Sequence, residues 1–400
     1  MIMESKNWNV YLFRDILERV EVPVNVESNK EYVQIGIRSH GKGLFYKEPV
    51  LGKALGNKQV FWIQPNCFIL NVVFAWEQAI TKTTEHEIGM IGSHRFPMYR
   101  PKNDLVDIDY LIYYFLTKRG TDILEAASPG GAGRNRTLGQ ERFLKSKITL
   151  PTLPEQQKIA AILSTQDKVI ELKEKLLVQK QQQKKYLMQQ LLTGKKRLPG
   201  FGGEWKTIHL NEISCRIETK NTVGNSNVLT ISAQYGLINQ TEFFDKVIAS
   251  NDKSNYYLLS KDEFAYNRSY SKGYPYGTIK RLKRYVQGVV SPLYICFAVN
   301  KKLASLDFLE QYFEASIINR EIQSIVQEGA RNHGMLNVAV DDFFRVKITM
   351  PEIEEQKEIA EILSTADHEI DLLQKSIETE KQKKKALMQL LLTGKVRVKI

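Results

Sequence analysis

Residues 147–197 read KITLPTLPEQQKIAAILSTQDKVIELKEKLLVQKQQQKKYLMQQLLTGKKR, and residues 347–397 read KITMPEIEEQKEIAEILSTADHEIDLLQKSIETEKQKKKALMQLLLTGKVR. The two stretches align without a gap, and whole blocks such as ILST and LLTGK recur at matching places. A repeat of this length does not arise by chance. The chain is therefore built as two copies of one structural plan.

Each copy predicts one long helix. A Pro- and Glu-rich beginning and a closing glycine, Gly194 or Gly394, are typical helix start and stop signals, and no Pro or Gly lies between them. Apolar residues recur every seventh position, with one Lys in each column, as in a coiled coil. The columns are Leu163, Ile170, Leu177, Lys184 and Leu191 in the first copy, and Leu363, Ile370, Ile377, Lys384 and Leu391 in the second. About 38 helical residues at 1.5 Å each give a helix of about 57 Å, which needs a partner to cover its apolar stripe.

The chain connections predict the direction of that pairing. About ten residues (195–204) separate the first helix from Trp205, where a second globular segment begins. If the second helix, entered at Pro351, covers the stripe of the first, it must run back along it, so the pair is antiparallel. Gln and Lys crowd the seam at 179–185 and 378–385. Either this is a solvated helix face or another protein docks there.

The remaining segments, 1–146 and 198–346, predict two globular heads. Both open with a Trp followed eight residues later by an Ile, at Trp8 and Ile16 and at Trp205 and Ile213. Short β-prone runs alternate with turns, and two apolar helical patterns follow. The runs are 32–37, 60–63, 67–74, 228–231 and 293–299, and the helical patterns are 109–117 and 308–326.

We therefore expect an α+β protein with two α/β heads separated by a long antiparallel two-helix coiled coil and related by a pseudo-two-fold repeat. The expected divisions are head 1 (1–146), the first spacer helix segment (147–197), head 2 (198–346) and the second spacer helix segment (347–400). A constant spacer with divergent heads is the arrangement expected when the heads determine specificity.

Several motifs resemble those of the specificity subunits of type I restriction-modification systems, the HsdS family, over essentially the full length. They are LPEQQKIA at 153–160, IEEQKEIA at 353–360, LLTGK at 191–195 and 391–395, and LPGFGGEW at 198–205. The resemblance implies that each head is a target recognition domain that reads one half of a split DNA site. It also implies that the helices act as spacer and as docking surface for two methyltransferase subunits. Head 1 lacks the Pro-Gly-Phe sequence that precedes Trp205.

The charge agrees with a DNA partner. The formal net charge is +12, which favours binding to a polyanion. Antiparallel repeats have an approximate two-fold axis, so the site should be bipartite and gapped.

Candidate DNA contacts are loops in which basic, aromatic and amide side chains mix, because these groups bind phosphates and base edges. In head 2 we select Asn267, Tyr270, Lys272, Tyr274, Tyr276, Lys280 and Arg281, with Arg331, Asn332 and His333 after a glycine. In head 1 the candidates are Arg38, His40, Lys42, His94 and Arg95, with Arg134, Asn135 and Arg136 after a glycine. The alternative is that tyrosines such as Tyr266 and Tyr270 pack a β-turn and that the head 1 residues are ordinary surface.

No catalytic function is expected. The sequence has no G-x-x-x-x-G-K-[ST] phosphate loop and no Asn-Pro dipeptide of the kind that amino-methyltransferases use. We therefore expect no cofactor or metal in this chain, and S-adenosylmethionine, ATP and Mg only in partner subunits. The sequence leaves open whether a restriction subunit joins the methyltransferase. Two rival functions are a scaffold whose heads bind proteins and a single-chain nuclease or methyltransferase.

The three cysteines are far apart, so a disulfide framework is not expected. No segment has the length and apolarity of a membrane span, and no secretion signal opens the chain. We expect a cytoplasmic protein.

Overall fold

The computed structural model describes residues 8–130, 136–232, 235–243, 252–270, 273–326 and 336–400. The chain divides into two compact units. Unit 1 contains residues 1–174 and 376–400, and unit 2 contains residues 175–375. Each unit thus combines one head with parts of two long helices, α5 (Leu153–Leu191) and α11 (Ile353–Leu391).

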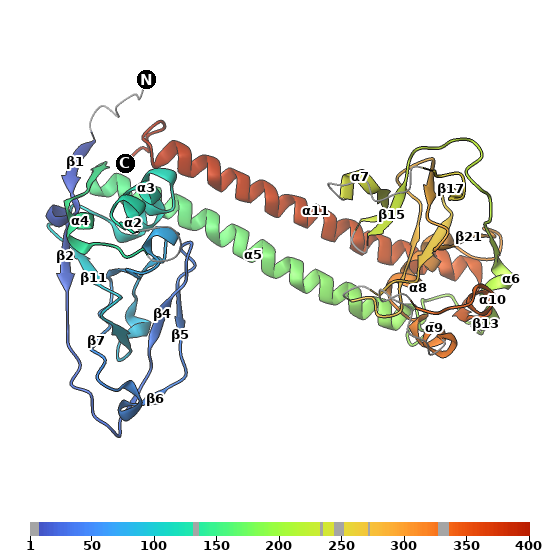
Figure 1. The fold of residues 1–400 in the computed structure, drawn as a ribbon, viewed down its shortest axis with the longest axis horizontal. Helices are drawn as coiled ribbons and strands as arrows, with labels where there is room; N and C mark the ends of the chain where they lie inside the picture. The colour runs from blue at the N-terminus through green and yellow to red at the C-terminus, as the bar shows by residue number, and fades with distance from the viewer. Residues whose placement is uncertain (1–7, 131–135, 233–234, 244–251, 271–272, 327–335) are drawn as a thin grey trace. The chain divides into compact units, whose positions relative to one another are not determined.

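Head 1 is α+β, with a four-stranded antiparallel sheet in the order β2-β11-β8-β9 and several two-stranded ribbons (Figure 1). Its strands are β1 (Asn9–Leu12), β2 (Leu17–Val20), β3 (Glu31–Tyr32), β4 (Ile35–Ile37), β5 (Leu44–Tyr46), β6 (Val50–Leu51), β7 (Val60–Trp62), β8 (Phe68–Leu70), β9 (Ile80–Lys82), β10 (Ile91–Ser93), β11 (Met98–Pro101) and β12 (Lys147–Leu150). Its helices are α1 (Phe13–Ile16), α2 (Ile108–Phe115), α3 (Lys118–Ala126) and α4 (Gln140–Lys145), with short 3-10 turns η1 (Gly52–Leu55), η2 (Ala75–Glu77) and η3 (Glu85–Glu87).

Head 2 repeats this frame with a four-stranded antiparallel sheet in the order β14-β21-β18-β19. Its strands are β13 (Lys206–His209), β14 (Ser214–Arg216), β15 (Leu229–Ser232), β16 (Gly236–Asn239), β17 (Tyr257–Ser260), β18 (Phe264–Asn267), β19 (Thr278–Arg281), β20 (Gln287–Val290), β21 (Ile295–Val299) and β22 (Lys347–Met350). Its helices are α6 (Leu210–Ile213), α7 (Gln240–Phe243), α8 (Leu306–Glu314), α9 (Asn319–Ile325) and α10 (Val340–Phe344).

These elements confirm the fold predicted from the sequence, with one error. Each β-prone run overlaps a strand, and α2 overlaps the range 109–117 that the first helical pattern indicated. The single helix predicted over 308–326 is wrong, because the chain forms α8 and α9 there. Ser316 between them has φ 59°, a left-handed conformation that an uninterrupted α-helix does not contain.

The first residues of each repeated stretch belong to the heads rather than to the helices. β12 pairs antiparallel with β1, and β22 pairs antiparallel with β13. In β12 and β22 exposed and buried side chains alternate, as expected for a strand with one buried face. The KITL and KITM blocks therefore form strands, and the heptad pattern of the helices begins only after them. Each head is therefore closed at its base by the residues that lead into a long helix.

The apolar core of each unit joins its head to both long helices. In unit 1, stacked rings of Phe13, Phe115 and Phe143 pack with the first turns of α5, with Leu391 at the end of α11 and with Leu392 directly after it. Unit 2 has the corresponding core, in which Phe264, Phe297 and Phe343 contribute rings. Burial of an aromatic side chain of this size is the largest single stabilising contribution available to a core of this kind.

The heptad columns lie on the inner face of the helix pair within each unit. Leu163 and Leu363 are fully buried, and the two lysines of the columns form ion pairs with the opposite helix. Lys384 pairs with Asp167 in unit 1, and Lys184 pairs with Asp367 in unit 2, each at 2.5 Å. In both units the pairing is antiparallel, because partners on α11 descend in number as those on α5 rise. Asp167 and Lys173 pair with Lys384 and Glu380 in unit 1. In unit 2, Lys180 and Lys184 pair with Glu369 and Asp367.

The Gln- and Lys-rich parts of the seam are held by polar contacts between the helices. Lys173 and Gln166 both bond to the carboxylate of Glu380, at 2.9 and 2.7 Å, and Lys381 pairs with Glu174 at 2.7 Å. In unit 2, Lys180 pairs with Glu369 at 2.7 Å. The charged residues that weaken the heptad pattern thus contribute to the helix pairing itself.

Two buried carboxylates tie the helix ends together. Glu155, at the start of α5, is 1% exposed and receives two hydrogen bonds from Arg397, at 2.6 and 2.7 Å. Glu355, at the start of α11, is fully buried and receives two from Arg197, at 2.8 and 2.7 Å. Each guanidinium also lies 6.0 Å from the ring centre of the Trp that opens its head, Trp8 or Trp205. The predicted Trp pair is thus part of the repeated anchor.

Replacing Arg397 by Met should destabilise unit 1, because Glu155 would keep a buried charge without its partner. Loss of one partner of a buried ion pair costs about 3–5 kcal/mol, and the half-exposed position of Arg397 reduces this to about 2 kcal/mol. Urea unfolding measures the change. A second substitution, Glu155→Leu, should recover most of the loss; a double variant as unstable as the sum of both single variants would contradict the role of this pair.

Helix pairing in unit 1 should also depend on acid. Hydrogen bonds from Lys173 and Gln166 lower the pKa of Glu380 to about 2 from its ordinary 4.5. The depressed pKa means that this contribution is complete above about pH 4.5 and is lost as pH falls towards 2. In Glu380→Gln the melting temperature should fall less over this window than in the wild type. The control Glu378→Gln, at an exposed neighbouring position, should retain the wild-type pH dependence; equal profiles for all three proteins would contradict this assignment.

Candidate nucleic-acid interface

Six residues predicted to contact DNA lie around one segment of head 1, residues 71–78. Hydrogen bonds and a ring contact link this segment to the loop 38–43, to the turn 93–96 and to residues 136–138. We name these residues the head 1 cluster: Arg38, His40, Lys42, His94, Arg95 and Arg136. Except for Arg136, which is half-buried, their side chains are exposed. The fold thus brings together residues that are distant in the sequence.

The loop 38–43 is held to residues 77 and 78 by its backbone. The His40 N–H donates to the Glu77 carbonyl at 2.8 Å, and the Gly41 N–H donates to the Gln78 carbonyl at 2.9 Å. His40 and Gly41 have φ values of 61° and 63°. A Cβ on Gly41 would also lie 2.7 Å from Leu116, so only glycine fits there.

Arg38 occupies the base of this loop. Its guanidinium donates to the Leu44 carbonyl and lies 5.3 Å from the ring centre of Phe45. Neither partner carries a negative charge, so the positive charge of this exposed side chain is not neutralised by them. A phosphate can therefore still bind Arg38 electrostatically.

Arg95 and Arg136 lie next to residues 71–78 and come from two other parts of the chain. The Val72 N–H donates to the Arg95 carbonyl at 3.0 Å, and the Val72 carbonyl accepts from the Leu138 N–H at 2.7 Å. The Arg136 guanidinium lies 5.5 Å from the ring centre of Trp76, a cation–π contact that orients it. The cluster therefore combines basic groups with an aromatic support.

In head 2, the hairpin β18–β19 contains most of the predicted contacts. Tyr266 is fully buried, stacks on Phe343 at 4.8 Å and donates to the Tyr276 carbonyl at 2.8 Å. This confirms the packing alternative for Tyr266, and Tyr276 lies half-buried against the same core. Tyr270 is 63% exposed, so the packing alternative is wrong for that residue. Asn267 accepts a hydrogen bond from the Ser269 N–H at 3.1 Å.

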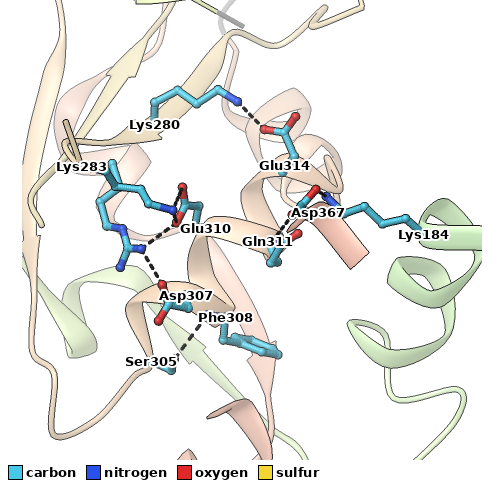
Figure 2. A network of polar contacts seen from close by, with 11 residues as sticks. Lys184, Lys280, Lys283, Ser305, Asp307, Phe308, Glu310, Gln311, Glu314 and Asp367 are labelled. Carbon is cyan, nitrogen blue, oxygen red and sulfur yellow. Dashed lines mark hydrogen bonds and ion pairs between the residues drawn. The ribbon is translucent and has the colours of Figure 1, made fainter. Parts of the chain in front are cut away.

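Three other predicted contacts are held by acidic residues of α8 (Figure 2). Arg281 is 7% exposed and pairs with Asp307 at 2.5 Å and with Glu310 at 2.8 Å. Lys280 forms an ion pair with Glu314. A buried, doubly paired arginine is not available to DNA, so we do not retain Arg281 as a contact, and Lys280 is largely neutralised.

Tyr274 belongs to the same network. Its hydroxyl donates to the second oxygen of the Glu314 carboxylate at 2.8 Å. Burial, followed by the charge and hydrogen bond of Glu314, raises the pKa of Tyr274 well above its ordinary value. Tyr274 thus stays protonated and fixes Glu314, which supports a structural role for this side chain. Glu310 also accepts from the exposed Lys283 (Figure 2).

Six predicted contacts lie outside the described residues: Arg134, Asn135, Lys272, Arg331, Asn332 and His333. Within the residues that the structure describes, no group of three or more His, Cys, Asp or Glu side chains could hold a metal ion. None of the described helices combines the length and apolarity needed to cross a bilayer.

The structure adds basic residues that the sequence did not indicate. Arg119 at the start of α3 and Lys385 of α11 line a groove of unit 1 together with His40. A signal for the first was the Lys118-Arg119 pair directly after the predicted helix 109–117. Lys385 belongs to the run of lysines 383–385, and the sequence does not indicate which lysines of this run line the groove.

Substitution of Arg281 should affect stability rather than DNA contact. Arg281→Met removes the cation that pairs with both Asp307 and Glu310, and it should lower the free energy of unfolding of unit 2 by about 3 kcal/mol. The control Lys283→Met, at a 58% exposed side chain, should change it by less than about 0.5 kcal/mol. Urea unfolding measures both. An Arg281→Met protein of wild-type stability that no longer binds duplex DNA would restore Arg281 as a DNA contact.

Comparison with known proteins agrees with this architecture. Two solved structures share the fold over nearly the whole chain: the HsdS subunit of Thermoanaerobacter tengcongensis (TM-score 0.56, 17% identity, 98% of both chains) and the type I restriction-modification S subunit of M. genitalium (TM-score 0.54, 13% identity, 96% of both chains). The type I restriction enzyme MjaVIII specificity subunit of Methanocaldococcus jannaschii is 25% identical over 327 residues, covering 74% of this chain and 72% of that protein. The profile of the type I restriction modification DNA specificity domain matches residues 31–182 and 203–381. The chain therefore belongs to the type I restriction-modification DNA specificity family.

Proposed function

We propose that this chain is the DNA-recognition subunit of a type I restriction-modification enzyme. It binds duplex DNA, and each head reads one half of a bipartite, gapped site. The two long helices dock two methyltransferase subunits, which perform the chemistry. The finding that supports this most directly is family membership over both halves of the chain.

The repeated frame supports two reading modules with different targets. Each unit has the same anchor, in which an arginine binds a buried glutamate, and the same four-stranded sheet. The surface residues differ: head 1 presents the head 1 cluster, whereas head 2 presents the exposed Tyr270 and the half-buried Asn267 on the hairpin β18–β19. Equivalent frames with unlike exposed surfaces fit two half-sites of unlike sequence.

In head 1, we assign phosphate contacts to Arg38, Lys42 and Arg95, because guanidinium and ammonium groups neutralise backbone charge. His40, His94 and Arg136 have the donors and acceptors needed to read base edges. In head 2, Tyr270 offers an exposed ring and Asn267 an amide for the same purpose. These roles are proposals that follow from exposure and chemistry.

The proposal places methyl transfer in partner subunits. The chain has no phosphate loop and no Asn-Pro dipeptide, so S-adenosylmethionine, ATP and Mg are assigned to those partners. A restriction subunit can join the same assembly. The expected location is the cytoplasm.

Exchange of one head tests this function. Residues 1–146 are replaced by the corresponding head of another family member, and the chain is co-expressed with its methyltransferase. Mapping of methylated bases should show one half-site changed and the other half-site and gap unchanged, because each head reads its own half.

The reciprocal exchange, of residues 198–346, is the matched control and should change the other half-site only. A site that changes in both halves would contradict independent reading by the heads. A wild-type chain that fails to bind duplex DNA in a gel-shift experiment would favour the protein-binding scaffold instead.

A further inference from the structure

Unit 1 contains a groove with an unusual charge distribution. It has a volume of about 640 Å³ and is lined by the connection between α2 and α3, by the start of α3 and by the end of α11. Figure 1 shows these helices. We call it the cationic groove. Its lining residues are His40, Leu116, Thr117, Lys118, Arg119, Lys381, Lys384, Lys385, Met388, Gln389, Leu392 and Thr393. This lining includes five Lys and Arg side chains and no Asp or Glu.

The charges of the groove differ in how far they are compensated. Lys118 pairs with Asp122, Lys381 with Glu174 and Lys384 with Asp167, all outside the lining. Within the part of the chain that the structure describes, Arg119 and Lys385 form no ion pair or hydrogen bond. Two uncompensated cations thus face one concave surface, an arrangement that attracts an anionic ligand.

Part of the groove lining is apolar, and we call this part, Leu116, Met388 and Leu392, the floor. A sugar-phosphate strand has matching chemistry, because anionic phosphates alternate with deoxyribose rings whose carbon faces are apolar. The rim cations can bind phosphates while the sugars lie over the floor. The groove is therefore complementary to one strand of a duplex in both charge and polarity.

The groove is continuous with the proposed reading surface of head 1. His40 lines it and belongs also to the head 1 cluster, and Gly41, the next residue, packs against Leu116 of the floor. DNA bound at the cluster would therefore reach the groove without leaving unit 1. This continuity favours DNA over an acidic protein segment as the occupant.

We propose that the cationic groove binds one sugar-phosphate strand of the duplex that head 1 reads, so that Arg119 and the spacer residue Lys385 contact phosphates. The inference rests on the proposed DNA-binding function and adds a spacer helix to the DNA contacts.

The test uses the full chain and a fluorescent duplex of unrelated sequence, with binding measured by anisotropy across a salt titration. Each phosphate contact contributes about 0.9 to the slope of log affinity against log salt. The double substitution Arg119→Gln and Lys385→Gln should therefore reduce that slope by about 1.8. The conservative pair Arg119→Lys and Lys385→Arg should keep it.

A matched control removes the same charge from unit 1 outside the groove. Lys158 and Lys168 are exposed on α5, and neither lines the groove. Their double Gln variant should keep the wild-type slope. Methylation mapping with the groove variant should return the wild-type site, because phosphate contacts do not select bases.

The outcomes separate the two proposals. If the wild-type chain shows no salt-dependent binding, the proposed function fails. If the wild type binds and the groove variant has the slope of the Lys158 and Lys168 control, the groove inference alone is overturned. An unchanged slope combined with loss of the co-purified methyltransferase would overturn it in favour of an acidic protein segment.

Discussion

The architecture of each unit depends on a buried carboxylate at the start of one long helix that is bound by an arginine just beyond the end of the other. Glu155 and Glu355 are almost completely removed from water. Burial of a carboxylate is costly unless a bidentate partner satisfies it, and such pairs contribute more to the choice of one arrangement than to net stability. A shift of one helix by a single turn would leave both glutamates without their arginines. The pair thus fixes the direction and register of the helices.

The interactions between these anchors are polar where the heptad pattern is polar. Asp167, Asp367 and Glu380 each bind a lysine of the opposite helix, so the Lys- and Gln-rich parts of the seam do not need an apolar partner. Asp167 and Asp367 also contact their own heads, through Tyr113 and Gln311 respectively (Figure 2 shows the second). The helix pair and the head of each unit are therefore joined by one polar network as well as by one apolar core. Such a frame can remain constant while exposed loops of the heads change.

In the heads too, an acidic partner distinguishes the cations that stabilise the fold from those that can bind DNA. Arg281 and Lys280 looked like DNA contacts in the sequence because they stand in a basic, tyrosine-rich hairpin. Their charges are instead neutralised by α8, whose acidic residues at 307, 310 and 314 recur every three or four positions and so share one helix face. Arg119 and Lys385 have no such partners among the described residues, although nothing local in the sequence distinguishes them from other surface lysines and arginines. Net charge predicts a polyanionic partner, but only the compensation of each charge indicates where that partner can bind.

The sequence by itself determined the two-fold repeat and the two long antiparallel helices, because heptad periodicity, helix stop signals and connection lengths are local properties. It indicated some strands of the heads as well, among them β4, β8 and β21, since alternation of apolar residues is also local. It did not determine the break between α8 and α9, where one left-handed residue interrupts a continuous apolar pattern. The availability of each charged side chain was decided only by the tertiary structure. The acidic partners of Arg281 lie on α8, and the groove that Arg119 lines is completed by α11 from the other end of the chain. Contacts between residues so far apart in the sequence depend on tertiary packing, which no local sequence pattern records.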